Sequence, residues 1–425
     1  METVLEKDVY KTSRFLYILE AAFEYFISIL VGGAYLAKVS AEIGLSDGLT
    51  GILTSFVSLG CGFQIIAIFL ANKTPVKRWV TLLHSLNQLF FALIYLVPFI
   101  QISKTGKTVL FILFLLAGHI INNVVNSPKL NWFMSLVDDR QRGRFTANKE
   151  ILSLLGGMIF SFVVGAIIDH FEALGDVNNA FIFCGLGVLG LTILHTLTLL
   201  FSKEKPIEKK EKVSIKQQLK ELLKDRDLFK VILISVFWNI SHYVATPFYG
   251  SYQIGALGFS MSFVAVLSAL YAVFRSLFSR PMGKYADKYS FAKMLNICFI
   301  IMVVAFAINT FTVPANGKFF YTAYYILYAI GMAGINSGEM NLIYDCVDRE
   351  KRVGALALKS TLSGFAGFFT TLFVSPLVDK IQANGNTFLG LNVYAQQVVS
   401  ALAMILTLAL LIYLNTVVRK VQRKN

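Results

Sequence analysis

The chain has 425 residues, of which 56% are hydrophobic and only 15% are charged, and its mean hydropathy is +0.64. Soluble domains contain about a quarter charged residues, so this composition excludes an ordinary soluble enzyme. A net charge of +14 is compatible with a nucleic-acid partner. The basic residues lie mainly in the loops on one side of the predicted spans, however, so membrane topology explains the charge and no nucleic-acid binding is predicted.

Apolar segments of more than 20 residues recur along the chain, long enough to cross a hydrocarbon layer of roughly 30 Å as helices. Backbone polar groups in lipid must be satisfied within the element, so each segment is predicted to be a helix. Alternating segments of about ten residues, typical of membrane barrels, are not apparent. The sequence therefore predicts an all-α integral membrane protein with twelve spans at 14–38, 49–71, 79–100, 108–136, 146–168, 179–201, 229–254, 262–282, 292–313, 319–345, 354–378 and 391–417.

Basic residues lie mainly in the loops on one side of these spans. With the N-terminus inside, the outer loops hold only Lys38, Lys104, Lys107, Lys318 and Lys380. The sequence therefore predicts a multi-pass protein of the cell membrane. By the positive-inside rule, both of its termini lie in the cytoplasm. The first apolar run is too long, and carries too many acidic residues, for a cleavable signal peptide. The four cysteines show no disulfide or metal-binding spacing.

The only long hydrophilic segment is 203–228, which divides the chain into two six-span bundles, 1–202 and 229–425. Within it, Ser214 and Gln217 have the spacing of a capping box. Apolar residues then fall on one face of the predicted helix, with lysines opposite. We expect an amphipathic helix on the cytoplasmic lipid surface; a regulatory docking site is the alternative. The apolar face comprises Ile215, Leu219, Leu222 and Leu223.

The two halves are related in sequence. Residues 137–170 align without gaps on 347–380 at a constant offset of 210, and NSPKLN at 126–131 falls on NSGEMN at 336–341. Two parallel six-helix repeats are typical of one large class of transporters. The offset matches polar and glycine positions, which chance similarity between apolar segments does not explain: Asp138 with Asp348, Arg142 with Arg352, Lys149 with Lys359, Ser153 with Ser363, Gly157 with Gly367, and Asp169 with Asp379.

These features resemble the major facilitator superfamily over the full length of the chain. The family's G-x-x-x-D-[RK] loop is similar to 283–288, GKYADK, whereas the equivalent FLANKTPVKR after the second span lacks the glycine and the aspartate. The fifth span has no proline, unlike that of drug/proton antiporters. The resemblance implies a twelve-helix fold, transport by alternating access, and cytoplasmic gating residues at Gly283, Asp287, Lys288, Asp138, Arg142, Asp348 and Arg352.

Four ionisable side chains lie within spans: Glu20, Glu24, Lys129 and Glu339. Charges within hydrocarbon are costly and point to function. All four lie at a similar depth, and the resemblance implies that their spans line a central cavity. Lys129 and Glu339 occupy equivalent positions of the repeat, which predicts that they pair across the two-fold axis when the cytoplasmic side closes. A glutamate that exchanges its lysine partner can bind and release protons. A fixed ion pair and direct substrate binding are the alternatives.

Polar residues crowd the spans that the resemblance places around the cavity, with tyrosines 249, 325 and 328 as further walls. His119 and His242 lie near mid-span and are candidates for titration near neutral pH. Charged residues nearer the cytoplasmic ends, namely Arg275, Lys149, Glu150 and Lys359, are expected to form salt bridges between the halves or to snorkel. The predicted substrate cavity comprises Asn122, Asn123, Asn126, Asn131, Trp238, Asn239, His242, Tyr243, Asn336 and Asn341.

The sequence thus predicts a secondary transporter that moves a polar small molecule, coupled to protons, in a lipid membrane, as a monomer and without a cofactor. A drug or metabolite efflux antiporter is the alternative within the same fold, and a receptor that does not transport is the alternative from another class. A membrane enzyme is disfavoured because the five histidines are scattered in sequence and do not predict a catalytic or metal cluster.

Overall fold

A computed structural model describes residues 8–71, 75–138, 141–205, 221–348 and 351–418. These residues are almost entirely helical. The first set of elements is α1 (Lys11–Leu30), α2 (Gly33–Glu42), α3 (Asp47–Thr54), α4 (Phe56–Gly62), α5 (Ile65–Ala71), α6 (Val76–Leu93), the 3₁₀ helix η1 (Ile94–Phe99), α7 (Lys104–Met134), α8 (Arg142–Ala173) and α9 (Val177–Phe201).

The second set comprises α11 (Arg226–Tyr243), η3 (Thr246–Phe248), α12 (Tyr249–Ile254), α13 (Met261–Lys288), α14 (Phe291–Thr310), α15 (Gly317–Cys346), α16 (Arg352–Ala383), β1 (Thr387–Phe388), β2 (Leu391–Asn392) and α17 (Ala395–Thr416). The last span was predicted to begin at 391, and this boundary is wrong. Phe388 pairs with Leu391 in a small antiparallel hairpin, which turns through Leu389 and Gly390 at positive φ and ends before α17 begins.

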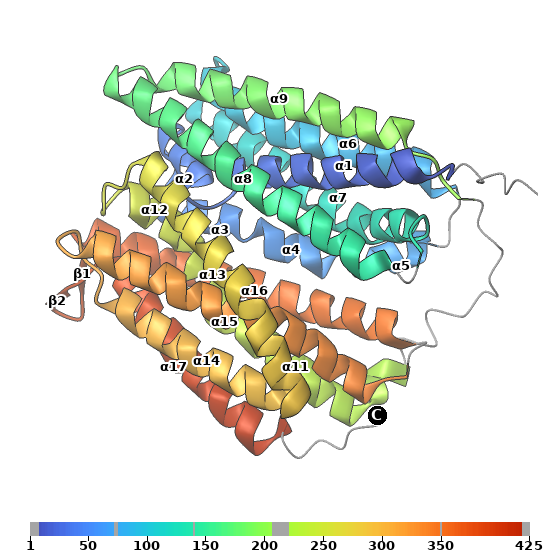
Figure 1. Ribbon diagram of the computed structural model, residues 1–425. Coiled ribbons are helices and arrows are strands. Elements are labelled where there is room, and N and C mark those ends of the chain that lie inside the picture. Colours follow the sequence, from blue (N-terminus) through green and yellow to red (C-terminus); the bar gives the residue numbers. More distant parts are fainter. Residues whose placement is uncertain (1–7, 72–74, 139–140, 206–220, 349–350, 419–425) are drawn as a thin grey trace, which may run out of the picture.

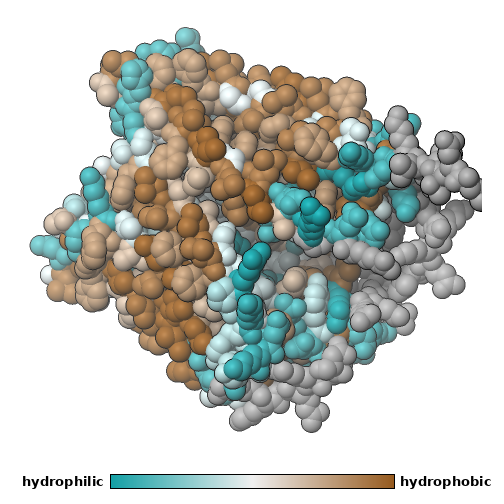
Figure 2. All heavy atoms as spheres, viewed as in Figure 1, coloured by the Kyte–Doolittle hydropathy of each residue, from teal (hydrophilic) through white to brown (hydrophobic). Residues whose placement is uncertain are grey.

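Ten helices in the described part of the chain are long and apolar enough to cross a membrane, and the pair α1 and α2, bent by 48°, forms an eleventh span. The remaining span of the predicted twelve is α15, which has 30 residues but is less apolar because tyrosine, asparagine and glutamate interrupt it. Figure 2 shows hydrophobic residues over the middle of the molecule and hydrophilic residues toward its two ends, as expected of a lipid-embedded bundle.

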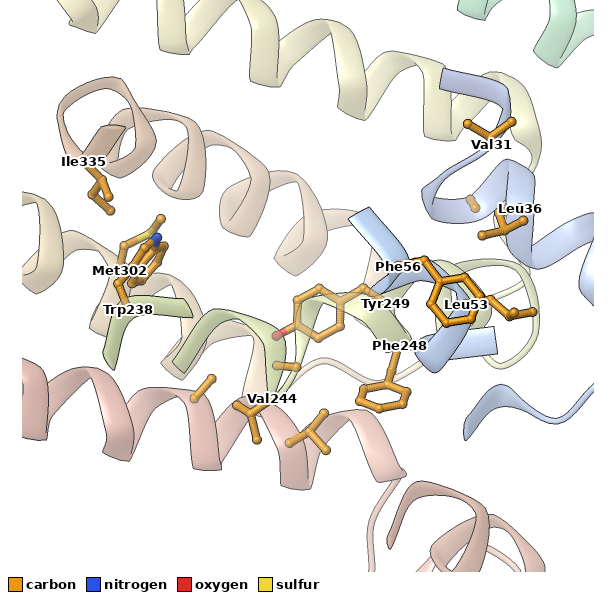
Figure 3. Close-up of a cluster of buried hydrophobic side chains, with 14 of the residues drawn as sticks. Val31, Leu36, Leu53, Phe56, Trp238, Val244, Phe248, Tyr249, Met302 and Ile335 are labelled. Atoms are coloured by element: carbon orange, nitrogen blue, oxygen red, sulfur yellow. The ribbon is translucent and has the colours of Figure 1, made fainter. Parts of the chain in front are cut away.

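The two sets of helices form two layers that meet along α8 and α13 and along α16 with α3 and α4 (Figure 1). A buried apolar core joins them, and Figure 3 shows Leu53 and Phe56 of the first set beside Phe248 of the second. Backbones approach closely here: a Cβ at Gly51 would lie 2.2 Å from the Phe248 ring, and one at Gly364 would lie 2.5 Å from the Gly62 nitrogen. Glycine is therefore required at these contacts.

Two aspartates at repeat-equivalent positions cap helices of the opposite half. The Asp169 carboxylate accepts hydrogen bonds from the backbone N–H groups of Met261 (2.7 Å) and Ser262 (2.8 Å) at the start of α13. The Asp379 carboxylate accepts from the Gly48 N–H (2.9 Å) at the start of α3 and from the Ser46 hydroxyl (3.1 Å). Both contacts lie at the end of the bundle opposite the start of α1 and the end of α17, called here the closed end.

From the closed end, α8 and α13 diverge toward the end that carries the termini (Figure 1). At the closed end they touch, since a Cβ at Gly165 would lie 2.9 Å from the Met261 carbonyl. The aspartate caps and this contact hold the halves together at the closed end. The two helices therefore lie closer to each other at the closed end than at the end that carries the termini (Figure 1).

The predicted amphipathic helix of the linker lies largely outside the described residues, including Ser214 and Gln217. Its described end contacts the second half of the chain instead of projecting to lipid. Leu222 is buried beside Gly354, and the Glu221 carboxylate pairs with Lys351 at 2.9 Å. This hydrogen bond raises the pKa of the Lys351 ammonium. Leu223 remains exposed.

Candidate functional site

The first span of each half is broken at its middle. In the first half the break is at Val31 and Gly32, followed by Gly33 at φ +53°. In the second half α11 ends at Tyr243, and the chain passes through η3, which contains Pro247, before α12 begins. The two breaks meet, because a Cβ at Gly250 would lie 2.5 Å from the Gly33 carbonyl oxygen. Broken helices at matching positions of two repeats commonly mark a transport site.

Two adjoining cavities lie between the halves beside these breaks, with volumes of about 300 and 240 Å³. Both are lined by Gly33, Gln253, Tyr271 and Tyr325. The larger also touches α8, and the smaller adds three tyrosines of the second half. None of the described residues lining either cavity carries a formal charge. The polar lining consists mainly of hydroxyl groups on aromatic rings, with smaller contributions from serine, threonine and glutamine: Tyr25, Tyr35, Tyr249, Tyr271, Tyr324, Tyr325 and Tyr328, together with Ser28, Ser161, Ser268, Thr246 and Gln253.

Polar partners orient several of these hydroxyl groups. The Arg275 guanidinium donates a hydrogen bond to the Tyr271 hydroxyl at 3.0 Å, and His242 Nε2 lies 2.5 Å from the Tyr328 hydroxyl. Gln253 donates to the Tyr325 hydroxyl at 2.9 Å. A fixed hydroxyl presents its donor or acceptor in one direction, which favours ligands of matching pattern.

The sequence predicted different residues for this lining. His242 contacts the cavity wall only through Tyr328 and Thr246, and Trp238 is buried against Phe299. The three tyrosines suggested as walls, at 249, 325 and 328, do line the cavities. None of the ten predicted cavity residues belongs to either lining: Asn122, Asn123, Asn126, Asn131, Trp238, Asn239, His242, Tyr243, Asn336 and Asn341.

Three of the predicted intramembrane charges come together within the first half. Lys129 of α7 donates hydrogen bonds to Glu20 (2.9 Å) and Glu24 (2.5 Å) of α1. The side chains of Glu20 and Lys129 are 0% and 2% exposed, and that of Glu24 is 19% exposed. The i, i+4 spacing of the glutamates on α1 places both carboxylates on the face that meets α7.

Two histidines that the sequence reasoning did not single out complete this group. His84 of α6 lies with Nε2 3.1 Å from Glu20 Oε1 and 2.8 Å from Lys129 Nζ. His195 of α9 lies with Nε2 2.9 Å from the same Glu20 oxygen. Both rings are fully buried. These two histidines are far apart in the sequence, and they meet because α6 and α9 pack side by side near α1.

The fourth predicted charge, Glu339, pairs within its own half. Its carboxylate lies 2.8 Å from Lys359 of α16. Lys129 makes its three hydrogen bonds to other groups, so the predicted pair of Lys129 and Glu339 does not form in this conformation. The expected salt bridges between halves are also not made by Lys149, which lies over the Tyr17 ring, or by Lys359. His119 is buried, and its Nε2 has no partner.

Glu20, His84 and His195 present ligand atoms within 4.8 Å of one another, a spacing suited to a metal ion. However, the Lys129 ammonium already contacts two of these three atoms. Zinc requires ligand distances of about 2.0–2.2 Å and would add two positive charges beside the ammonium. The donor set therefore fits the ammonium already present better than a metal ion.

The predicted gating residues lie at the end that carries the termini. Gly283, Asp287 and Lys288 belong to the last turns of α13 and not to a loop, since the helix extends to Lys288. The two hairpins of the repeat share a turn: the Gln141 N–H donates to the Asp138 carbonyl, and the Lys351 N–H donates to the Asp348 carbonyl. Arg142 and Arg352 begin α8 and α16, and the Arg352 guanidinium lies over the Tyr344 ring.

Comparison with known proteins agrees with this architecture. The structure is similar to the nucleoside transporter NupG, with a TM-score of 0.70 and 14% identity over 97% of this chain and 99% of that one. It is also similar to a D-xylose-proton symporter (TM-score 0.69, 14% identity, 94% and 97% covered). A bacterial homologue of the human lysosomal transporter Spinster, in an inward-facing conformation, gives a TM-score of 0.66 at 14% identity, with 97% of each chain covered.

No curated protein sequence matches the chain. A family model described as Major Facilitator Superfamily matches residues 16–371. This match confirms the predicted resemblance and the twelve-helix fold, and it identifies the chain as a transporter-family protein and not an enzyme. The chain belongs to the major facilitator superfamily.

Proposed function

We propose that this protein is a proton-coupled secondary transporter that carries an uncharged, polar small molecule by alternating access. The observation that carries the proposal is the pair of tyrosine-lined cavities between the halves, at the point where two broken spans meet. Cavities of roughly 300 Å³ are at the lower end of the range for small-molecule sites, which suits a ligand the size of a monosaccharide or nucleoside.

The chemistry of the lining supports an uncharged ligand. Aromatic faces stack on sugar or base rings, while hydroxyl and amide groups satisfy the polar edges of the ligand. A charged ligand in an uncharged, partly desolvated cavity would lose hydration without gaining a partner. The similar structures include a nucleoside transporter and a D-xylose-proton symporter, which agrees with this class of ligand.

The arrangement of the halves supports an inward-facing state. The caps made by Asp169 and Asp379 join the halves at the closed end, and α8 and α13 diverge toward the termini (Figure 1). With both termini on the cytoplasmic side of the cell membrane, as the basic loops predict, α8 and α13 diverge toward the cytoplasm. One chain contains both halves of the pathway, so we propose a monomer.

The asparagines retain a proposed role on the open side of the cavities. Asn126 and Asn336 occupy equivalent positions of the repeat, and both are exposed in the structure. An unpaired amide facing lipid costs several kcal/mol, so we propose that these side chains face the water-filled entrance. The cytoplasmic gating roles of Asp138, Asp348 and Asp287 are likewise proposals for the state in which this entrance closes.

A thermal-shift screen of the purified protein against metabolite classes tests the substrate proposal. We expect pentoses, hexoses or nucleosides to stabilise the protein, and organic acids and amines to have no effect. Tyr325→Phe removes a hydroxyl from both cavities and should weaken the binding of a hit by about 5- to 10-fold, the loss of one hydrogen bond of about 1 kcal/mol. Tyr413→Phe, whose hydroxyl bonds to the Lys230 carbonyl away from the cavities, is the matched control.

Two results would reject this assignment. One is stabilisation by charged metabolites alone. The other is equal affinity of Tyr325→Phe and the wild-type protein for every hit. Binding without any flux of the hit across liposomes would instead favour the receptor alternative.

A further inference from the structure

We propose that the exposed side of α13 toward its end, together with the start of α14, is a binding site for an anionic phospholipid of the leaflet on the side of the termini. We call it the α13 lipid site. It goes beyond the proposed function, because its ligand is a membrane lipid and not a transported solute. The site consists of an apolar part followed by a basic part: Val273, Leu277, Arg280, Lys284, Lys288, Tyr289 and Lys293.

One side of α13 carries most of both parts. Its side chains follow one another at intervals of three or four residues, which places them on one face of a helix with about 3.6 residues per turn: Val273, Leu277, Arg280, Lys284 and Lys288. All five are exposed, Val273 by 46% and Leu277 by 61%. By the same periodicity, Ser268 and Tyr271, which line the larger cavity, lie on the opposite face. The exposed stripe therefore faces away from the transport pathway.

The length of α13 places the change from apolar to basic residues at the membrane surface. The helix begins at Met261 and has 28 residues, about 42 Å at about 1.5 Å per residue. The hydrocarbon layer is roughly 30 Å thick, so a helix that enters it near Met261 leaves it close to Arg280. Figure 1 shows α13 (yellow) along the front of the molecule, and Figure 2, in the same view, shows hydrophilic residues toward the end near the termini. The basic part therefore lies at the level of lipid headgroups.

The turn after α13 brings a fourth cation to the stripe. The Lys293 ammonium, from the first turn of α14, lies 5.5 Å from the centroid of the Tyr289 ring, and the Lys288 ammonium lies 5.2 Å from the same centroid. Tyr289 is 48% exposed, and the Tyr285 ring lies beside it with centroids 4.7 Å apart. Tyrosine rings are enriched at the membrane surface. One interfacial ring thus holds two ammonium groups near one another.

The basic part of the site has no anionic partner in the described part of the chain. Three other lysines of the same half each pair with a carboxylate: Lys230, Lys351 and Lys359. None of the four basic side chains of the site forms an ion pair among the described residues. Asp287 is the acidic residue nearest to them in sequence, and four cations with one carboxylate leave a net charge of three positive. This charge favours an anion from outside the chain.

An anionic phospholipid matches both parts of the site. Its phosphate accepts charge-assisted hydrogen bonds from lysine and arginine, while its acyl chains pack on Val273 and Leu277, which a soluble anion leaves exposed. Clusters of four or more basic residues beside a membrane-spanning helix are typical of anionic-lipid recognition. A choline headgroup offsets the charge of its own phosphate, so a zwitterionic lipid gains less from the net positive charge of the site.

Photo-crosslinking of the full chain in liposomes made of equal amounts of phosphatidylglycerol and phosphatidylcholine tests the site. Benzoylphenylalanine in place of Leu277 captures neighbouring acyl chains, and mass spectrometry identifies the captured lipid. The same group in place of Leu186, a 59% exposed residue in the outer half of α9, reports a lipid-facing surface without a basic stripe. We expect an excess of phosphatidylglycerol at position 277 and nearly equal capture of the two lipids at position 186.

Two charge-matched variants separate the site from the net charge of the protein. The test variant removes three cations of the site and leaves Lys288 in place: Arg280→Gln/Lys284→Gln/Lys293→Gln. The control removes three cations from the predicted outer loops: Lys104→Gln/Lys107→Gln/Lys318→Gln. Each basic side chain near an anionic surface contributes about a fivefold preference. The excess at position 277 should therefore fall by at least about 10-fold in the test variant and persist in the control.

The proposal is overturned by equal capture of the two lipids at position 277, by an excess that survives in the test variant, or by its loss in the control. It is also overturned if glycerol 3-phosphate, added at constant ionic strength, removes the excess from the wild-type chain, because the site would then bind a soluble phosphate compound. No solute is transported in these measurements, so a failed uptake experiment would reject the proposed function and leave the lipid site in place.

Discussion

The two aspartate caps between the halves allow a quantitative prediction of the equilibrium between the inward-facing state and the state in which the closed end opens. Asp169 and Asp379 each accept two hydrogen bonds at the start of a helix of the opposite half. Alternating access requires these contacts to break when the closed end opens. Replacing both residues with alanine should therefore shift the protein away from the inward-facing state.

The magnitude follows from the geometry of the caps. Removing the capping side chain of a helix typically costs about 1 kcal/mol. The two caps join different helix pairs at the closed end, α8 with α13 and α16 with α3, and share no partner, so their effects should be roughly additive. A loss of about 2 kcal/mol changes the ratio of the two conformations roughly 30-fold. Each single variant should shift the ratio about fivefold.

Spin labels at positions 173 and 383, the exposed ends of α8 and α16, report the separation of the halves at the closed end. We expect one short distance in the otherwise unchanged protein and a dominant longer distance in Asp169→Ala/Asp379→Ala. Asp176→Ala is the control, because Asp176 caps α9 within its own half. An unchanged distance distribution in the double variant, or an equal change in Asp176→Ala, would refute the reasoning.

Three further substitutions test the packing and the charges. Gly364→Val places a side chain against the Gly62 backbone and should destabilise the protein by about 1–3 kcal/mol, visible as a lower thermal unfolding temperature; an unchanged temperature would contradict the contact. Gly250→Ala should hinder closure beside Gly33 and lengthen the spin-label distance, and a wild-type distance would contradict this. Lys129→Met removes the ammonium partner of the Glu20 and Glu24 carboxylates and should cost about 3–5 kcal/mol at pH 8 but less at pH 5, where protonation neutralises them; an equal loss at both pH values would argue against it.

The sequence repeat predicted much of the fold. The offset of 210 matched Asp169 with Asp379, and the structure gives both residues the same capping role toward the other half. It also matched the two hairpins, which share the same turn. Hydrophobic length located the spans to within a few residues, because membrane thickness sets the length of a helix. The breaks had local signals too, in Gly32-Gly33 and Thr246-Pro247.

The charged site could be predicted only in part. Glu20 and Glu24 indicated a charged face because their spacing is local to one helix. His84 and His195 are 111 residues apart on α6 and α9 and meet only when both helices pack on α1. Their partners depend on helix rotation, which hydropathy does not define. In this conformation Lys129 bonds within its own half, and its pairing with Glu339 stays a prediction for the state that is closed toward the cytoplasm.

The central claim is that proton binding drives the movement of an uncharged solute, with Glu24 in the predicted charge network. The most direct measurement is accumulation in liposomes, under a pH gradient, of the solute that stabilises the protein in the thermal-shift screen. We predict that the wild-type protein accumulates the solute until a protonophore is added, whereas Glu24→Gln exchanges it across the membrane but does not accumulate it. Accumulation by Glu24→Gln at the wild-type level, or accumulation that persists with the protonophore, would contradict the claim.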